Sequence, residues 1–509
     1  MHQHRAVHLL EGARGFRPWQ ETLARDLGKH SREKPALIRI GCRSESPDLQ
    51  SRNSDSVRVP VRHSRAAVSM VECPEMTADH QLEAAPVSVR DGGPGRGERE
   101  ARVSPAGAAA PPQVVQVIQE FSAAGGAETV AWELARTFAR AGVPNHVIAN
   151  RVAGRVEAGI TVETVAPWLA RIPTRGPLRH LGRLLVVPAF TLAASLALRR
   201  HRGAVVISHG DSLAGDILVV HAVNAASLQE KRQEGRWRWL LNPMHLWVAL
   251  RDRLMITGGR YARYVAVSRR VRTELQVHHG VPARQIEVIP NGIDLARFRG
   301  DPEAGRAIRA EFGIPDEAKL LVFVGHEFAR KGLAHAVGAL RLLGPDYWLV
   351  VVGSDNPAPY RDLARPWSDH VIFAGSRSDA PAFYAAADAL VLPSRYETFS
   401  LVCMEAMACS LPVFATAVGG IEDYLLEGVN GYFIKPLAHQ IAATIGRVLS
   451  DAERVAALRA GARATAQDYG WDRIGQPYLA LVRRIAAAKQ ARRGEGLPES
   501  AAPAGRGPS

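Results

Sequence analysis

Residues 393–412, PSRYETFSLVCMEAMACSLP, follow the apolar run 389–392, ALVL, and decide how the rest of the chain is interpreted. The run is apolar on both faces, which is typical of a buried parallel strand. A polar turn comes next. Residues 400–408 then have a helical composition that ends before Pro412, because proline cannot continue a helix. The stretch therefore predicts a strand, a turn and a helix.

Two acidic residues flank the start of this helix, Glu397 in the turn and Glu405 roughly 7–8 Å further along the axis. Between them, the backbone amides of Phe399, Ser400 and Leu401 have no partner inside the helix. Those amides and the helix dipole favour an anion such as a diphosphate. Because two carboxylates would repel phosphates, we expect them to accept hydrogen bonds from hydroxyls. A sugar and a ribose on either side of a diphosphate would supply these.

This arrangement, with the Ala-Met-Ala that follows it, resembles the Glu-x7-Glu motif of retaining GT-B glycosyltransferases, family four in particular. In that family the first Glu contacts the donor sugar and the second contacts the nucleotide ribose. The resemblance implies these roles for Glu397 and Glu405. An ordinary strand–helix unit with two surface glutamates is the alternative, and the spacing alone leaves both open.

The composition, 47% hydrophobic and 22% charged over 509 residues, indicates a globular protein of two or three domains. The formal net charge of +14 favours an anionic partner, either substrate phosphates or a membrane surface. Arginine-rich coding from a GC-rich genome is an alternative source of part of this excess. No nucleic-acid motif is present, so no nucleic-acid partner is expected. The four cysteines are too few and scattered for a disulfide frame, which indicates a cytoplasmic protein.

Residues 1–112 are rich in Arg, Ser, Pro and Gly without apolar periodicity, and are predicted to be a disordered extension. They do not begin with a secretory signal. A true start further along, near Met70 or Met76, is a second interpretation. Under either interpretation, we assign no catalytic or binding role to these residues.

The first ordered unit is a strand at 113–118, a helix at 129–141 and a strand at 146–149, joined first by a glycine turn. Glycines at such a turn let a backbone approach phosphates closely. The Gly-x-Gly-x-x-Gly spacing of dinucleotide binders is missing. Gly125 and Gly126, with the Ala-Glu after them, instead resemble the Gly-Gly-x-Glu start of family-four transferases. The resemblance implies that both glycines face the donor.

Two stretches further along the chain suggest a membrane or a saccharide. Residues 171–202 place arginines on both sides of the uncharged run 184–198, which Pro188 interrupts and which is shorter than the roughly 20 residues that span a bilayer. A basic segment on an anionic membrane surface and a buried helix with basic ends both stay open. The aromatic–basic cluster made by Arg-Trp-Arg-Trp at 236–239, His245 and Trp247 would stack on an acceptor sugar, meet a membrane interface, or pack helices.

His209 and His221 each follow a predicted strand, at the carboxyl end where ligands bind in open α/β sheets. The family often keeps a histidine near the donor sugar at the position of His221, so the resemblance implies a catalytic role for it. A structural histidine is the alternative at both positions.

The segments 264–268 and 286–294 resemble the Val-x-Ser and Ile-Pro-Asn-Gly-Ile-Asp motifs that lead from the first domain of the family into the second. The Pro-Asn-Gly sequence fixes a specific turn. We place Asn291 of this turn among the substrate-binding residues.

Arg330 and Lys331 follow the strand 320–325, at a turn into a helix. Adjacent cations there can neutralise a diphosphate as charge builds on it during glycosidic cleavage. The family usually has Gly-Arg-x4-Lys-Gly, and His326 replaces the first Arg here. The adjacent Arg-Lys pair resembles lipopolysaccharide core glucosyltransferases. The alternative is that Arg330 and Lys331 are ordinary solvated side chains without a role in binding.

Strands alternate with helices in both halves, which predicts α/β architecture: the GT-B fold, with two Rossmann-like, doubly wound parallel-sheet domains facing across a cleft. We expect the ordered chain to divide into an N-terminal acceptor domain, a C-terminal donor domain, a helix crossing back to the first domain, and a flexible tail, at residues 113–295, 296–465, 466–488 and 489–509.

The resemblance implies a retaining glycosyltransferase that moves a sugar from a nucleotide-diphosphate sugar, a co-substrate rather than a cofactor, to a saccharide or glycolipid acceptor. The chain has no Asp-x-Asp, so no bound metal is expected. In retaining members the donor phosphate is thought to deprotonate the acceptor. The basic composition favours a lipid-linked or lipopolysaccharide acceptor at the inner face of the cytoplasmic membrane. A transferase with a soluble acceptor, a non-catalytic nucleotide-sugar binding protein and a nucleotide-sugar epimerase are the alternatives.

Overall fold

The computed structural model describes residues 111–173, 179–233 and 243–495, which all belong to one compact unit, 101–509. The prediction of disorder for 1–112 therefore lies almost entirely outside the described residues, as do residues 236–239 of the aromatic cluster. Trp247 of that cluster lies in the helix Pro243–Asp252, where its indole N–H has no hydrogen-bond partner among the described residues.

A seven-stranded sheet forms the first domain, in the order β5-β3-β1-β6-β7-β8-β9 with every neighbouring pair parallel. Its strands are short and mostly buried on both faces, as parallel strands covered by helices require. They are β1 (Val114–Val117), β3 (Asn145–Ala149), β5 (Ile160–Thr164), β6 (Val205–Ser208), β7 (Ile217–Val220), β8 (Arg263–Ala266) and β9 (Ile286–Val288).

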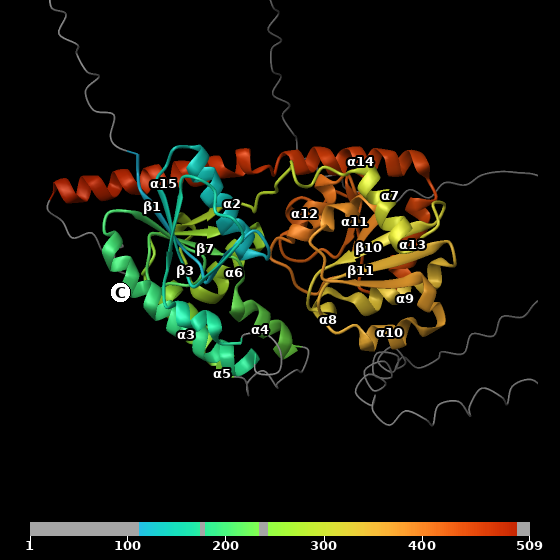
Figure 1. The fold of residues 1–509 in the computed structure, drawn as a ribbon, viewed down its shortest axis with the longest axis horizontal. Coiled ribbons are helices and arrows are strands. Elements are labelled where there is room, and N and C mark those ends of the chain that lie inside the picture. The colour runs from blue at the N-terminus through green and yellow to red at the C-terminus, as the bar shows by residue number, and fades with distance from the viewer. Residues whose placement is uncertain (1–110, 174–178, 234–242, 496–509) are drawn as a thin grey trace, which may run out of the picture. The chain divides into compact units, whose positions relative to one another are not determined.

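Helices cover both faces of this sheet (Figure 1). Val115 and Val117 of β1 pack against α3, whereas Val114 packs on the other face in the cluster that contains α2. This alternation follows from the two-residue period of a strand. The helices of the domain are α2 (Ala127–Arg140), α3 (Arg179–Ala197), α4 (Asn224–Gln233), α5 (Pro243–Asp252) and α6 (Arg269–His279).

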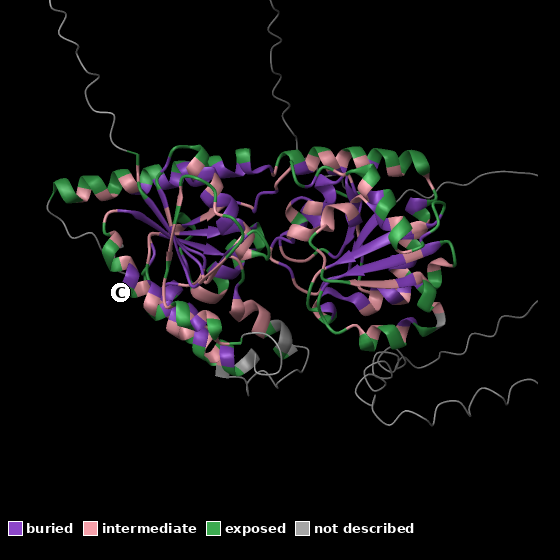
Figure 2. Cartoon of the chain, in the orientation of Figure 1, coloured by how far each residue is buried: buried purple, intermediate pink, exposed green. Residues whose placement is uncertain are grey.

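The second domain is built on a six-stranded parallel sheet in the order β12-β11-β10-β13-β14-β15. Its strands are β10 (Lys319–Val324), β11 (Tyr347–Val352), β12 (Val371–Gly375), β13 (Ala389–Leu392), β14 (Val413–Ala415) and β15 (Gly431–Phe433). Its helices are α7 (Pro302–Glu311), α8 (Phe328–Lys331), α9 (Leu333–Leu343), α10 (Ala358–Ala364), α11 (Ala380–Ala386), α12 (Leu401–Ala408), α13 (Ala438–Leu449) and α14 (Ala452–Gln467). Figure 2 shows the buried strands of both sheets enclosed by partly exposed helices.

The last helix, α15 (Trp471–Gly494), returns to the first domain and packs on α2 and β6. A side chain at Gly292 would collide with the Trp471 ring at 2.5 Å, so the turn between the domains lies directly against the start of α15. The helix continues six residues past the predicted end at 488. Lys489 explains this, because its Nζ bonds Asp216 Oδ2 at 2.6 Å.

The fold class is confirmed, and three local predictions need correction. The residues after β1 were predicted as a turn, but Glu120–Ser122 form β2, which pairs with β4 (Arg151–Ala153) in a small parallel sheet. The helix of the opening stretch begins at Leu401, one residue later than predicted. Pro188 does not interrupt α3, because the helix is anchored in the core on both sides of the proline, by Val186 before it and by Phe190 and Ala194 after it.

Candidate active site

Glu397, Arg330 and Lys331 come together beyond the carboxyl end of β13. Lys331 Nζ lies 3.0 Å and Arg330 Nη1 lies 3.4 Å from the same oxygen, Glu397 Oε1. The Ser394 hydroxyl donates to that oxygen at 2.9 Å. Arg330 Nε also pairs with Glu327 Oε2 at 2.8 Å, and the Glu327 side chain is 69% exposed. One buried acid is thus bound by two cations, and the solvent-facing acid is the one that a ligand could displace.

Backbone geometry brings these side chains together. A side chain at Gly332 would clash with the Pro393 carbonyl oxygen at 2.1 Å, so α8 approaches the end of β13 as closely as a glycine allows. Gly325 leaves the space in which the stem of Lys331 lies. Glu327 and Ser400, the residues preceding α8 and α12, have φ values of +56° and +64°. Such strain in residues other than glycine concentrates at functional sites.

Burial tends to raise the pKa of Glu397, but Lys331 and Arg330 outweigh it and hold the pKa below its usual value. The acid is therefore ionised at neutral pH. Lys331 is buried as well, so its charge is stabilised mainly by this partner. The arrangement can hold a further anion at its open side, on Arg330.

The start of α12 supplies amide donors beside this cluster. Among the described residues, the amides of Phe399, Ser400 and Leu401 have no hydrogen-bond acceptor. Glu405 lies further along α12, where its Oε2 accepts a 2.8 Å hydrogen bond from the Tyr384 hydroxyl. Burial raises the pKa of Glu405, and that hydrogen bond partly offsets the rise. Sequence reasoning did not identify Tyr384, because nothing near it in the chain marks it as a partner of this acid.

In the first domain, a series of hydrogen bonds connects uncharged side chains. Asn145 Nδ2 donates to the Ala135 carbonyl at 3.3 Å, and Asn145 Oδ1 lies 3.4 Å from Gln116 Nε2. Gln116 Oε1 lies 3.1 Å from His209 Nε2, and His209 Nδ1 lies 3.1 Å from His221 Nε2. The Ala135 carbonyl can only accept a hydrogen bond. Each side chain in the series Asn145, Gln116, His209 and His221 must therefore donate to the group that lies nearer to this carbonyl. His209 therefore carries its proton on Nε2 and His221 does the same, which leaves the lone pair on His221 Nδ1 free to accept.

Burial keeps both imidazoles neutral. It lowers the pKa of His221 to about 4 and that of His209 well below its usual value, in the second case with help from His221. Sequence reasoning placed both residues at strand ends but did not predict that they bond each other.

The remaining predicted residues stand apart from the two groups. Gly126 precedes α2, and its amide donates to Glu128 Oε2 at 3.1 Å, while Gly125 has a φ of +122° that favours glycine. Asn291 is buried in the interdomain turn, and its Oδ1 has no partner among the described residues. Asp211, to which no role was assigned, accepts a bond from the Gln119 amide at 2.8 Å, and burial raises its pKa to about 6.

One group in the described part of the chain has the composition of a metal site, namely His146, Glu163 and His201. Both histidine Nε2 atoms lie near Glu163 Oε2, at 3.2 and 3.1 Å, and Arg200 pairs with its other oxygen at 3.1 Å. These contacts satisfy the carboxylate, and within the described part of the chain no hydrogen bond or ion pair joins this group to the residues around Glu397 or His221.

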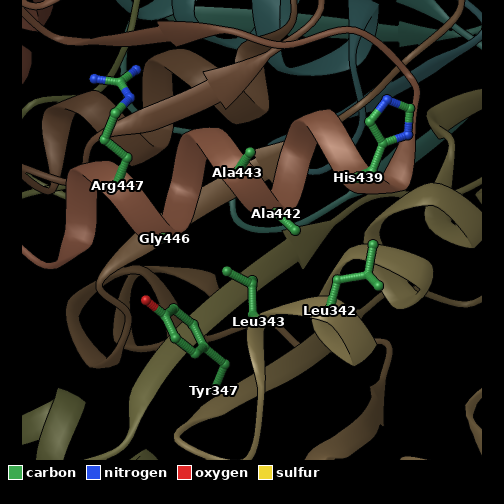
Figure 3. A pocket seen from close by; sticks show the side chains of 8 residues that line it. All are labelled: Leu342, Leu343, Tyr347, His439, Ala442, Ala443, Gly446 and Arg447. Atoms are coloured by element: carbon green, nitrogen blue, oxygen red, sulfur yellow. The ribbon is translucent and has the colours of Figure 1, made fainter. Parts of the chain in front are cut away.

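A cavity of about 460 Å³ lies where the domains meet, between α4 and α6 on one side and the loops after β13 and β14 on the other. Tyr396, the neighbour of Glu397, lines it and donates to Glu274 Oε2 at 3.4 Å. Figure 3 shows a second cavity, of about 480 Å³, between α13 and the segment from Leu342 to Tyr347. Tyr347 begins β11, so this second cavity lies at the amino edge of the sheet, opposite the edge where ligands bind.

Two family models match the chain. One described as Glycosyltransferase Family 4 matches residues 124–297, and one described as Glycosyl transferases group 1 matches residues 305–465. Between them they cover the whole second sheet and every strand of the first sheet except β1.

Curated relatives match in part. A D-inositol 3-phosphate glycosyltransferase of Xylanimonas cellulosilytica is 34% identical over 244 residues, which are 45% of this chain and 58% of the relative. One from Salinispora tropica is 33% identical over 241 residues, 43% of this chain and 50% of the relative. The chain thus spans about half the length of the curated relatives it matches.

Solved structures share the fold. WaaG, a glycosyltransferase involved in lipopolysaccharide biosynthesis, aligns with a TM-score of 0.60 at 23% identity, over 74% of this chain and 99% of that one. The sucrose-phosphate synthase of Thermosynechococcus elongatus also gives 0.60, at 21% identity over 74% and 100%. Anabaena HepE, solved with UDP, gives 0.55 at 19% identity over 73% and 100%.

Proposed function

We propose, from the premise that this chain belongs to glycosyltransferase family 4 and has the GT-B fold, that it transfers a sugar from a nucleotide-diphosphate sugar to an acceptor hydroxyl. The observation that carries the proposal is the convergence of Arg330 and Lys331 on Glu397, in the turn that leads into α12, where the first backbone amides have no hydrogen-bond acceptor among the described residues. This is a site built for a diphosphate with hydroxyls next to it.

Arg330 and Lys331 would bind the diphosphate and stabilise the charge that grows on it as the glycosidic bond breaks. When the phosphate replaces Glu327 at Arg330, Lys331 would keep one N–H on Glu397 and direct another to the diphosphate. Glu397 would then have its second oxygen left for sugar hydroxyls. Glu405 would accept from the ribose hydroxyls, with Tyr384 holding its carboxylate in place. His221 Nδ1 would accept a hydrogen bond from a hydroxyl of the donor sugar.

The transfer is proposed to retain the anomeric configuration, with the donor phosphate taking the acceptor proton on the same face. The cationic pair and the helix amides would carry the leaving-group charge without a divalent metal, which fits a sequence that lacks Asp-x-Asp.

For the acceptor, we favour a saccharide on a glycolipid or a growing cell-surface polysaccharide such as lipopolysaccharide. The protein would then work in the cytoplasm, at the inner face of the membrane. The basic composition supports this choice. A soluble acceptor is the second candidate, since the curated relatives are named for the transfer of a sugar to inositol 3-phosphate.

Thermal-shift screening of the full chain against UDP, GDP, ADP and TDP sugars tests the donor proposal. One base should raise the melting temperature, and the stabilised complex should release nucleotide in proportion to the acceptor glycosylated. Release of free nucleotide without an acceptor would indicate an epimerase instead. Binding without any turnover would indicate a nucleotide-sugar binding protein, and stabilisation by none of the sugars would overturn the proposal.

A further inference from the structure

Helix α3 is apolar on two opposite faces. Val186, Phe190 and Ala194 are buried against the sheet, with Val115 and Val117 beneath them. The outward face carries four leucines whose exposed fractions are high: Leu181 68%, Leu185 54%, Leu192 52% and Leu196 57%. At 100° per residue these four lie within an arc of about 60°, opposite the buried face.

Helix α5, which packs against α3 (Figure 1), also carries exposed leucines. Its Leu246 and Leu250 are 64% and 51% exposed. We call these six residues the leucine face: Leu181, Leu185, Leu192, Leu196, Leu246 and Leu250. A water-facing helix normally carries charged residues at such positions, and a gathered apolar surface marks an interaction site.

The chain around the leucine face is strongly basic. No Asp or Glu occurs between Glu163 and Asp211, whereas seven arginines do: Arg171, Arg175, Arg179, Arg183, Arg199, Arg200 and Arg202. Those directly after α3, Arg199, Arg200 and Arg202, are exposed. A second copy of this chain would bring like charges together, but an anionic surface would neutralise them. We propose that the leucine face, with Arg199, Arg200 and Arg202, docks the first domain on an anionic lipid bilayer.

Docking on the surface fits better than spanning. The segment Leu181–His201 is long and apolar enough to cross a membrane, with a mean hydropathy of 1.8, and one third of it is buried. Removing it from the domain would expose Val115, Val117 and the rest of the cluster beneath it. One face of α3 thus fits the interpretation as a buried core helix, and the proposal assigns the opposite face to lipid. The proposal does not depend on the transfer reaction.

Vesicle flotation of the full chain without substrate tests it. The wild type should float with phosphatidylglycerol–phosphatidylcholine vesicles and only weakly with pure phosphatidylcholine. The variant Leu185→Gln/Leu192→Gln should bind the anionic vesicles at least about tenfold more weakly. The matched control is Leu342→Gln/Leu426→Gln, which changes two leucines of the second domain that are 60% and 54% exposed and should bind like wild type.

A second variant removes charge without touching the apolar surface. Arg199→Gln/Arg202→Gln should lose affinity for anionic vesicles but bind neutral vesicles like wild type. Three results would overturn the proposal: wild type that stays unbound with anionic vesicles, a leucine variant that binds like its control, or a leucine variant whose main change is the loss of self-association on size-exclusion chromatography with light scattering. The last result would make the leucine face an interface between copies of this chain.

Discussion

The two halves of the candidate site solve the problem of a buried polar group in opposite ways. In the second domain, the basic side chains of Lys331 and Arg330 gather around Glu397, whose pKa they hold below its usual value. In the first domain, burial keeps His209 and His221 neutral, and hydrogen bonds replace charge. The difference indicates what each half is suited to bind. Paired charges can be redistributed to a phosphate, whereas an uncharged acceptor such as His221 Nδ1 suits a sugar hydroxyl.

The largest effect is expected when the acid of the charged half is neutralised. Glu397→Gln leaves the buried Lys331 without its counter-charge, so the free energy of unfolding should fall by roughly 3 kcal/mol. It also removes the acceptor for the sugar, and kcat/KM should fall about a thousandfold, which is about 4 kcal/mol. Urea unfolding and steady-state turnover measure the two effects.

Glu327→Gln is the matched control, because Glu327 also pairs with Arg330 but is 69% exposed. Its unfolding free energy should change by less than about 1 kcal/mol. Equal losses in the two variants would contradict the assignment of Glu397 as the central acid.

Changing the neutral half should affect turnover without affecting phosphate binding. His221→Ala removes the acceptor at Nδ1, so kcat should fall by about 10- to 100-fold while the affinity for the nucleoside diphosphate stays unchanged. Gln116→Leu should have a smaller effect in the same direction, since it only breaks the hydrogen bond that sets the tautomer of His209. A large loss of diphosphate affinity in either variant would show that the halves do not divide the work in this way.

The pH dependence of the unfolding free energy tests whether His209 and His221 are neutral in the folded protein. The pKa of His221 is lowered to about 4 in the folded protein, so between about pH 4 and 6.5 only the unfolded chain binds this proton. Stability should therefore fall as pH falls through that window, and His209 contributes in the same direction. The slope, at most about 1.4 kcal/mol per pH unit for each group, should decrease in His221→Gln. Denaturant unfolding at pH 4.5, 5.5 and 6.5 measures it, and an unchanged slope would contradict a buried neutral imidazole.

The smallest effect is expected at Glu405. Tyr384→Phe removes the hydroxyl that donates to this acid, so the pKa of Glu405 should rise further and its carboxylate should lose its fixed orientation. We expect KM for the donor to rise by roughly three- to fivefold, about 0.7–1 kcal/mol, with kcat little changed. A fall in kcat alone would place Glu405 with the reacting sugar instead of the ribose.

The sequence allowed the fold class and most strands to be predicted, because runs such as 320–324 and 389–392 are apolar on both faces and alternate with helices. Two local features could not be predicted in this way. The short strand β2 is set by its partner β4, about thirty residues away, and not by its own pattern. The helix α3 passes through Pro188 because its buried face holds it, which no local rule includes.

The candidate site could be predicted residue by residue but not as a network. Spacing placed Glu397, Arg330 and Lys331 at strand-to-helix turns, since parallel strands end at one edge of a sheet. It could not show that Arg330 and Lys331 both contact the same oxygen of Glu397. That contact depends on the close approach of Gly332 to Pro393. The bond between His209 and His221 likewise depends on neighbouring strands being in register, which becomes visible only in three dimensions.

The most direct test of the division between the two halves is calorimetric titration of the nucleoside diphosphate identified by the donor screen. Lys331→Met should bind it at least about tenfold more weakly than wild type, a loss of about 1.4 kcal/mol, whereas His221→Gln should bind it like wild type. If Lys331→Met keeps the wild-type affinity, the cationic pair does not hold the diphosphate and the account is wrong.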